Sequence, residues 1–152
     1  MNAKYYIQKL NENKLLRNQI ECEEFDNALE ILSNYDDKDL IEDLLLVFDD
    51  STDEDEVMFG LIHFIEKYEM NLYLNGLIRT LPQMLSNAKD WAIILNKRIL
   101  NSEQYRNAYI KVINNMGEEY KSMISNLMNE IKFNNPKKFE DSVNNLISKL
   151  NC

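Results

Sequence analysis

Apolar residues recur along most of the chain at the spacing i, i+3, i+4, i+7, which is the period of one face of an α-helix. One such stripe consists of Phe25, Ala28, Leu29 and Leu32, and similar stripes occupy residues 57–68, 105–116, 120–131 and 139–150. Each stripe predicts an amphipathic helix with one face in a core. Glycine (3) and proline (2) are scarce, which argues against a turn-rich β architecture.

The stripes and the breaks between them place nine helices along the sequence. We expect them near residues 3–18, 22–33, 37–48, 54–68, 71–80, 88–100, 103–116, 118–133 and 137–150. Connections of a few residues force neighbouring helices to run antiparallel. The sequence therefore predicts an all-α fold of eight or nine short helices stacked as helical hairpins in an α-solenoid of the HEAT type, with a compact bundle as the alternative. Residues 1–152 are expected to form a single domain.

Two prolines give local predictions about helix ends. Pro82 is expected to end the helix before it at Leu81. Pro136 follows Asn135 and is expected at the first position of the last helix, where its missing N–H has no partner to lose. Ser102 is expected near the start of the helix that carries the 105–116 stripe.

Cysteine usage and hydropathy bear on the compartment. Cys22 and Cys152 form no disulfide framework, so two reduced thiols are expected. The first ten residues contain charges and tyrosines, with no apolar segment of the kind found in signal peptides. The longest apolar runs, Leu44–Phe48 and Val57–Ile62, are far shorter than the roughly 20 residues that span a bilayer. The sequence predicts a cytoplasmic protein with no membrane partner.

Charge is distributed very unevenly. Residues 1–70 contain 19 acidic and 6 basic residues, a net charge of −13, whereas residues 71–152 contain 7 acidic and 11 basic residues, a net charge of +4. An acidic surface repels the phosphates of nucleic acids, so direct DNA or RNA binding is excluded. It attracts a basic protein and speeds its association. The charge pattern therefore favours a protein-binding function.

The acidity is densest in residues 49–56, Asp-Asp-Ser-Thr-Asp-Glu-Asp-Glu, which we call the acidic run. One interpretation is a helix start, in which Ser51, Thr52 or Asp53 is the N-cap and acids in the first turn suit the helix dipole. Two acids would suffice for that role, and six clustered carboxylates repel one another. The other interpretation is a partner-binding patch made of Asp49, Asp50, Asp53, Glu54, Asp55 and Glu56.

No constellation in the sequence predicts catalysis. There is no Cys–His pair, nucleophile elbow, zinc motif or phosphate-binding loop, and no cofactor or metal site is predicted. His63, the single histidine, lies three residues before Glu66 on one helical face and is expected to be a partly buried histidine with a hydrogen bond. Trp91 is expected in the core, with Arg98 nearby, but both residue types are also enriched at binding hot spots.

A metal-dependent alternative rests on two acidic pairs. Asp39 and Glu42, and Asp53 and Glu56, have the acid-x-x-acid spacing by which all-α nucleotide pyrophosphohydrolases bind Mg²⁺. Against this alternative, the second pair falls at a helix start, and no cluster of lysines and arginines is evident beside it to hold phosphates. Pairs at this spacing are also common on helix surfaces.

The segment from Phe48 to Glu66, which runs from the Asp-rich turn through Glu-Val-Met-Phe-Gly to a histidine and a glutamate on one helix, carries a family likeness. Together with the segment from Trp91 to Asn101, it resembles the all-α immunity proteins of bacterial polymorphic toxin systems, and specifically the immunity protein 30 family, over about residues 28–116. By this resemblance the motif positions are Asp49, Asp50, Glu56, His63, Glu66, Trp91 and Arg98.

The resemblance implies a small cytoplasmic protein that is made beside a secreted toxin and neutralises it, as in contact-dependent inhibition. The implied partner is the C-terminal domain of the cognate toxin. An acidic inhibitor would suit a basic nuclease, whose active site it would cover as a phosphate mimic. His63, Glu66, Trp91 and Arg98 are then either partner contacts or structural residues. The alternative function is that of a generic helical scaffold with another protein partner.

Overall fold

The computed structural model describes residues 2–151, and within that range it contains nine α-helices, one 3-10 helix and no strand. The all-α class is therefore confirmed. The elements are α1 (Ala3–Asn13), α2 (Gln19–Leu32), η1 (Lys38–Leu40), α3 (Ile41–Leu45), α4 (Asp55–Ile65), α5 (Met70–Asn87), α6 (Lys89–Leu100), α7 (Glu103–Asn114), α8 (Glu118–Asn134) and α9 (Pro136–Ser148).

The chain divides into two compact units, with the boundary inside α6. The N-terminal unit ends at Trp91 and the C-terminal unit begins at Ala92. The single domain, and the choice between a solenoid and a bundle, stay predictions. None of the described helices is long and apolar enough to cross a membrane. Cys22 is a free, half-buried thiol, and Cys152 lies outside the described residues.

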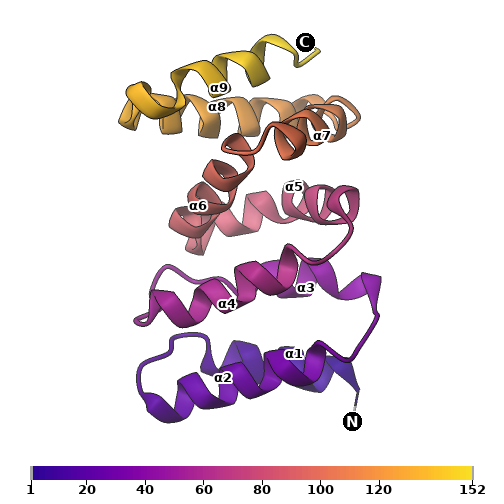
Figure 1. Cartoon of the computed structure of the whole chain (residues 1–152), viewed down its shortest axis with the longest axis vertical. Helices are drawn as coiled ribbons and strands as arrows, with labels where there is room; N and C mark the ends of the chain where they lie inside the picture. Colours follow the sequence, from indigo (N-terminus) through magenta and orange to yellow (C-terminus); the bar gives the residue numbers. More distant parts are fainter. Residues whose placement is uncertain (1, 152) are drawn as a thin grey trace. The chain divides into compact units, whose positions relative to one another are not determined.

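In the N-terminal unit, α1 and α2 form a hairpin, α4 packs on α2 and α3, and α3 packs on α5 (Figure 1). The apolar stripes meet in a core that includes the fully buried Phe25, Leu44 and Leu61. A glycine allows α5 to approach α3 closely, because a Cβ atom at Gly76 would lie 3.3 Å from two side-chain carbons of Ile41. α4 is central in this unit, yet one of its faces is open to solvent at His63.

In the C-terminal unit, α8 packs against α9 and α7 contacts both. The side chain of Ser102 accepts a hydrogen bond from the Tyr105 N–H (3.3 Å) and caps α7, and Pro136 is the first residue of α9, as predicted. A polar pair lies inside the core, where the Tyr109 hydroxyl donates to Asn96 Oδ1 at 2.7 Å and both residues are fully buried. This bond satisfies an amide oxygen that would otherwise be stranded away from water.

Several predicted helix boundaries are wrong. α1 stops at Asn13 instead of residue 18, because Leu16 adopts a positive φ of 49° that an α-helix cannot contain. The predicted helix over 37–48 is divided into η1 and α3. The helix predicted to end before Pro82 continues through it to Asn87. The proline removes one backbone donor, and the packing of the buried Leu81 and Met84 on either side outweighs that loss.

Candidate functional site: an anchored acidic run

The acidic run is attached to the turn between α1 and α2 by three contacts. Lys14 Nζ lies 3.3 Å from the Asp49 carboxylate, the Thr52 hydroxyl donates to the Lys14 carbonyl (2.7 Å), and the Asp53 N–H donates to the Leu15 carbonyl (2.8 Å). Thr52 is 8% exposed, so its hydroxyl is used inside the fold. Two segments nearly forty residues apart in the sequence are therefore joined by backbone and side-chain contacts together.

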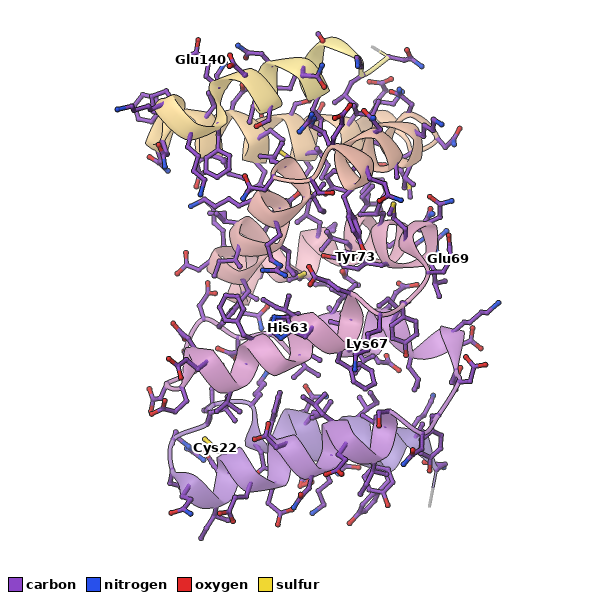
Figure 2. The ribbon with its side chains drawn as sticks, in the orientation of Figure 1. Cys22, His63, Lys67, Glu69, Tyr73 and Glu140 are labelled. Atoms are coloured by element: carbon purple, nitrogen blue, oxygen red, sulfur yellow. The ribbon has the colours of Figure 1, made fainter. Side chains whose placement is uncertain are left out.

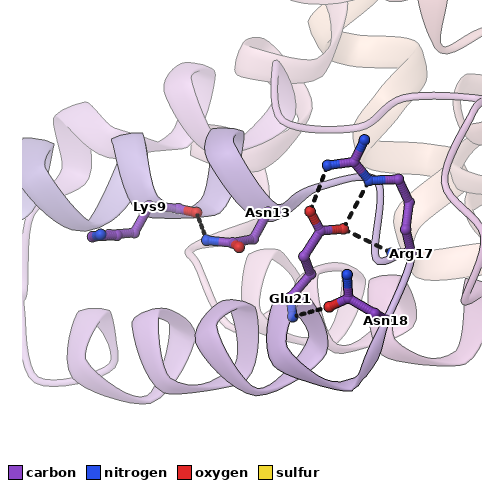
Figure 3. A network of polar contacts seen from close by, with 5 residues as sticks. All are labelled: Lys9, Asn13, Arg17, Asn18 and Glu21. Atoms are coloured by element: carbon purple, nitrogen blue, oxygen red, sulfur yellow. Dashed lines mark hydrogen bonds and ion pairs between the residues drawn. The ribbon is translucent and has the colours of Figure 1, made fainter.

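The α1–α2 turn is itself held by a local polar network (Figure 3). Glu21 accepts hydrogen bonds from the backbone N–H of Arg17 (2.8 Å) and from its guanidinium (2.6 and 3.1 Å), while the Asn18 side chain accepts from the Glu21 N–H (2.9 Å) and caps α2. Hydrogen bonds from Arg17 lower the pKa of Glu21 from 4.5 to about 2. The turn is thus a defined support for the acidic run.

The other side of the acidic run is attached to the junction of α5 and α6. The Asp50 N–H donates to the Asn87 carbonyl (2.9 Å), and the Asp50 carboxylate accepts from the Asp90 N–H (3.2 Å) in the first turn of α6. The indole N–H of Trp91 donates to the Asp49 carbonyl at 3.0 Å. Because carboxylates are favourable at helix N-termini, Asp50 stabilises the start of α6.

The Trp91 side chain packs in the core beneath the acidic run. It is 3% exposed, and its ring centroid lies 5.6 Å from that of Phe48 and 5.7 Å from that of Phe59. The residue thus joins the helix α4, the acidic run and α6 at one point. Burial of an indole with its N–H satisfied is among the larger single contributions to a core.

Asp49 and Asp50 therefore have structural contacts of their own. One oxygen of Asp49 accepts from the Ser51 N–H (2.8 Å) and the other is paired with Lys14, while Asp50 caps α6. Their part in partner binding stays a prediction. The predicted N-cap of the following helix is wrong: α4 begins at Asp55 after Glu54, with no side-chain capping bond, because Thr52 is bonded to the α1–α2 turn.

The four remaining acids of the run point their charge outward. Asp53, Glu54, Asp55 and Glu56 are all exposed, at the end of the run and in the first turn of α4. Asp55 and Glu56 suit the dipole of α4, as the helix-start interpretation expects. The anchored backbone carries four adjacent exposed carboxylates, and such an arrangement can bind cationic groups of a partner.

The other predicted site residues lie in different settings. His63 is exposed on α4 instead of partly buried, with its ring 6.4 Å from that of Phe59 (Figure 2). Glu66 is half-buried at the C-terminal end of α4. Arg98 is half-buried on α6, in the C-terminal unit. Sequence reasoning missed Lys14, Leu15 and Thr52 as anchors, because nothing in a local pattern signals a bond across such a sequence separation.

The acidic pairs proposed for Mg²⁺ have separate surroundings. Asp39 belongs to η1 and Glu42 to α3, where its carboxylate lies 3.9 Å from Arg79, and Asp53 and Glu56 belong to the acidic run. Within residues 2–151, no group of three or more histidine, cysteine, aspartate or glutamate side chains converges on a possible metal position.

Fold and site together define an all-α protein that presents exposed carboxylates on an anchored loop. A comparison with protein families then gives the assignment: the profile of the family described as Immunity protein 30 matches residues 12–109. This match spans well over half of the chain, so the chain belongs to the Immunity protein 30 family, and the resemblance seen in the sequence is confirmed. No curated protein and no solved structure matches the chain. Family membership implies a non-enzymatic inhibitor that binds a cognate toxin protein.

Proposed function

We propose that the chain is a cytoplasmic immunity protein that binds the C-terminal domain of a secreted bacterial toxin and blocks its activity. The observation that carries the proposal is the family match over residues 12–109. The matched region includes the acidic run, both segments that anchor it, and α4. Because the toxin acts inside cells, an inhibitor in the same compartment protects the producing cell and its siblings.

The docking surface in this proposal is the exposed part of the acidic run. Asp53, Glu54, Asp55 and Glu56 meet a basic face of the toxin, and their adjacent charges accelerate the encounter. Asp49 and Asp50 support this surface through Lys14 and the start of α6. A toxin that cuts nucleic acid binds the substrate phosphates with basic residues, so carboxylates that replace those phosphates would suit a nuclease.

The proposal is tested by recovery and by protection. The tagged chain is expressed in its native cell and purified at low salt, and the proteins bound to it are identified. We expect the C-terminal domain of a secreted toxin, in a complex that weakens as salt rises. Expression of that domain alone in a host should stop growth, and co-expression of the chain should restore it. Growth arrest that persists despite co-expression contradicts the immunity function.

A further inference from the structure

A hollow of about 330 Å³ opens in the N-terminal unit at the opposite end of α4 from the acidic run. Its lining comes from segments 33–38 and 64–72, so it lies where α2 ends, α4 ends and α5 begins. We call it the Tyr68 pocket. α4 has 11 residues and is about 16 Å long, so one partner face of ordinary size can reach both of its ends.

The walls of the Tyr68 pocket are aromatic and only partly covered. Tyr35, Phe64, Tyr68 and Leu72 are half-buried in the lining. The rings of Phe64 and Tyr68 have centroids 6.2 Å apart, and the Tyr68 hydroxyl donates to the Asp37 carbonyl at 3.2 Å, which fixes the ring. Half-buried aromatic rings around a hollow, with a charged rim, are what an interface anchor site presents before its partner arrives.

The lining itself is balanced in charge, with Asp36 and Glu69 against Lys38 and Lys67, but the chain segments that carry it are acidic. Residues 33–39 and 64–72 together contain five acidic residues and two lysines, a net charge of −3, and Asp37 lies next to Asp36 beside the Tyr68 hydroxyl. Asp36 is exposed in the lining, whereas both carboxylate oxygens of Glu69 accept backbone N–H groups at the start of α5 (3.1 and 2.9 Å). Burial, and then the charges of Asp37 and Asp36, raise the pKa of Tyr68, in line with a negative potential at its hydroxyl.

We propose that the Tyr68 pocket receives an arginine side chain of the basic toxin domain. The guanidinium would stack on the rings of Tyr35, Phe64 or Tyr68 and pair with Asp36. A planar, weakly hydrated guanidinium gains from both an aromatic face and a carboxylate, which is why arginine suits such a site better than an aliphatic side chain. The inference rests on the proposed function for its partner, and it adds a second docking point apart from the acidic run.

Two lysines make the charge of the occupant measurable. Lys38 and Lys67 are exposed in the lining of the Tyr68 pocket, and Lys67 lies in the turn that follows α4 (Figure 2). A positive occupant is repelled by these ammonium groups, and a negative occupant is attracted by them. Removal of Lys67 therefore strengthens binding of a cation and weakens binding of an anion.

The test uses the whole chain and three small probes, so it needs no toxin. N-acetyl-arginine methylamide is titrated while backbone amide shifts are followed by NMR, with the neutral citrulline analogue and the acidic glutamate analogue as comparisons. We expect saturable shifts in segments 33–38 and 64–72 with the arginine probe, and at least threefold weaker binding of the citrulline probe. Asp36→Asn should weaken the arginine probe about threefold, the size of one partly exposed ion pair, and Lys67→Met should strengthen it about twofold.

Matched variants make the result decisive. Asp141→Asn removes an exposed acid of the C-terminal unit and should leave probe binding unchanged. Equal binding of the arginine and citrulline probes overturns the cationic occupant, as does preference for the glutamate probe with weaker binding in Lys67→Met. Shifts confined to residues 49–56 overturn the pocket. Any of these results leaves the toxin-binding function intact, because recovery of the toxin and protection from it test that function separately.

Discussion

The two units of the chain use the same kind of core and very different surfaces. Residues 1–91 contain 20 acidic and 8 basic residues, a net charge of −12, whereas residues 92–152 contain 6 acidic and 9 basic residues, a net charge of +3. Both units bury apolar helix stripes. The N-terminal unit additionally holds a long charged connection in place with contacts from distant segments, and the C-terminal unit has only short connections between its helices.

Under the proposed function, the difference separates what stabilises the chain from the surface proposed to recognise a partner. Packing of amphipathic helices explains both units, so it cannot be the source of a specific function. The excess of negative charge and the anchored acidic run both occur in the N-terminal unit. The family match covers most of that unit and leaves α8 and α9 outside. The surface of α8 and α9 should therefore tolerate changes that the N-terminal unit does not.

The largest expected effect is at the junction that supports the acidic run. Trp91→Ala removes a buried indole between Phe48 and Phe59 together with its bond to the Asp49 carbonyl. We expect the free energy of unfolding to fall by about 3–5 kcal/mol, as for other large-to-small core substitutions. Urea unfolding followed by circular dichroism measures it. Trp91→Phe, which keeps a ring and loses the hydrogen bond, should be the milder variant; equal losses would contradict a packing role.

A smaller loss of stability is expected inside the C-terminal unit. Tyr109→Phe removes the hydroxyl that satisfies the fully buried Asn96 oxygen, which should lower the free energy of unfolding by about 1–3 kcal/mol. The same urea experiment applies. Binding to the toxin should be unchanged under conditions where the variant is folded, and weaker binding there would break the division of roles between the units.

The surface contrast is tested directly by removal of charge. Asp53→Asn, Glu54→Gln, Asp55→Asn and Glu56→Gln in one variant should slow association with the toxin about tenfold at low salt and leave helicity intact. Stopped-flow mixing at two salt concentrations gives the rates. The matched control neutralises four exposed acids of the C-terminal unit, Glu118, Glu119, Glu140 and Asp141. An equal slowing in both variants would mean that only total charge matters.

The smallest expected effect is a pH dependence of stability from Glu21 in the α1–α2 turn, to which the acidic run is attached. The pKa of Glu21 is lowered from 4.5 to about 2 by hydrogen bonds from Arg17, so its stabilising effect is complete above about pH 4.5 and is lost as the pH falls through 2. Glu21→Gln lacks this dependence. The stability difference between the parent chain and the variant should be constant at neutral pH and shrink between pH 4.5 and 2. Denaturant midpoints across that range measure it, and a difference that persists at pH 2 would contradict this assignment.

Much of the fold follows from the sequence because helix periodicity is a local signal. The stripes at 105–116, 120–131 and 139–150 each correspond to a helix, and Ser102 and Pro136 mark helix starts as expected. The errors occur where a distant contact overrides a local preference. Pro82 is accommodated because neighbouring residues are buried, and Thr52 does not cap α4 because its hydroxyl is bonded to Lys14.

The site was predictable in composition and not in arrangement. The density of acids at residues 49–56 is visible in the sequence, and so is the family likeness that the profile match confirms. Nothing in the sequence distinguishes Asp49 and Asp50, which have internal bonds, from the exposed Asp53 and Glu54. That distinction depends on the Lys14 ammonium and the Asp90 N–H, which lie beside the carboxylates of Asp49 and Asp50 and come from two other segments, the α1–α2 turn and the α5–α6 junction.

Trp91, whose indole N–H donates to the Asp49 carbonyl, is also an intrinsic fluorescent reporter. The sequence has a single tryptophan, so indole emission arises at one place only, beside the acidic run. The eight tyrosines are spread along the chain and report on no single region. Fluorescence excited at wavelengths that tyrosine does not absorb will therefore report on this loop in the unlabelled protein. Contact of a toxin domain with the loop should change the wavelength or the intensity of that emission.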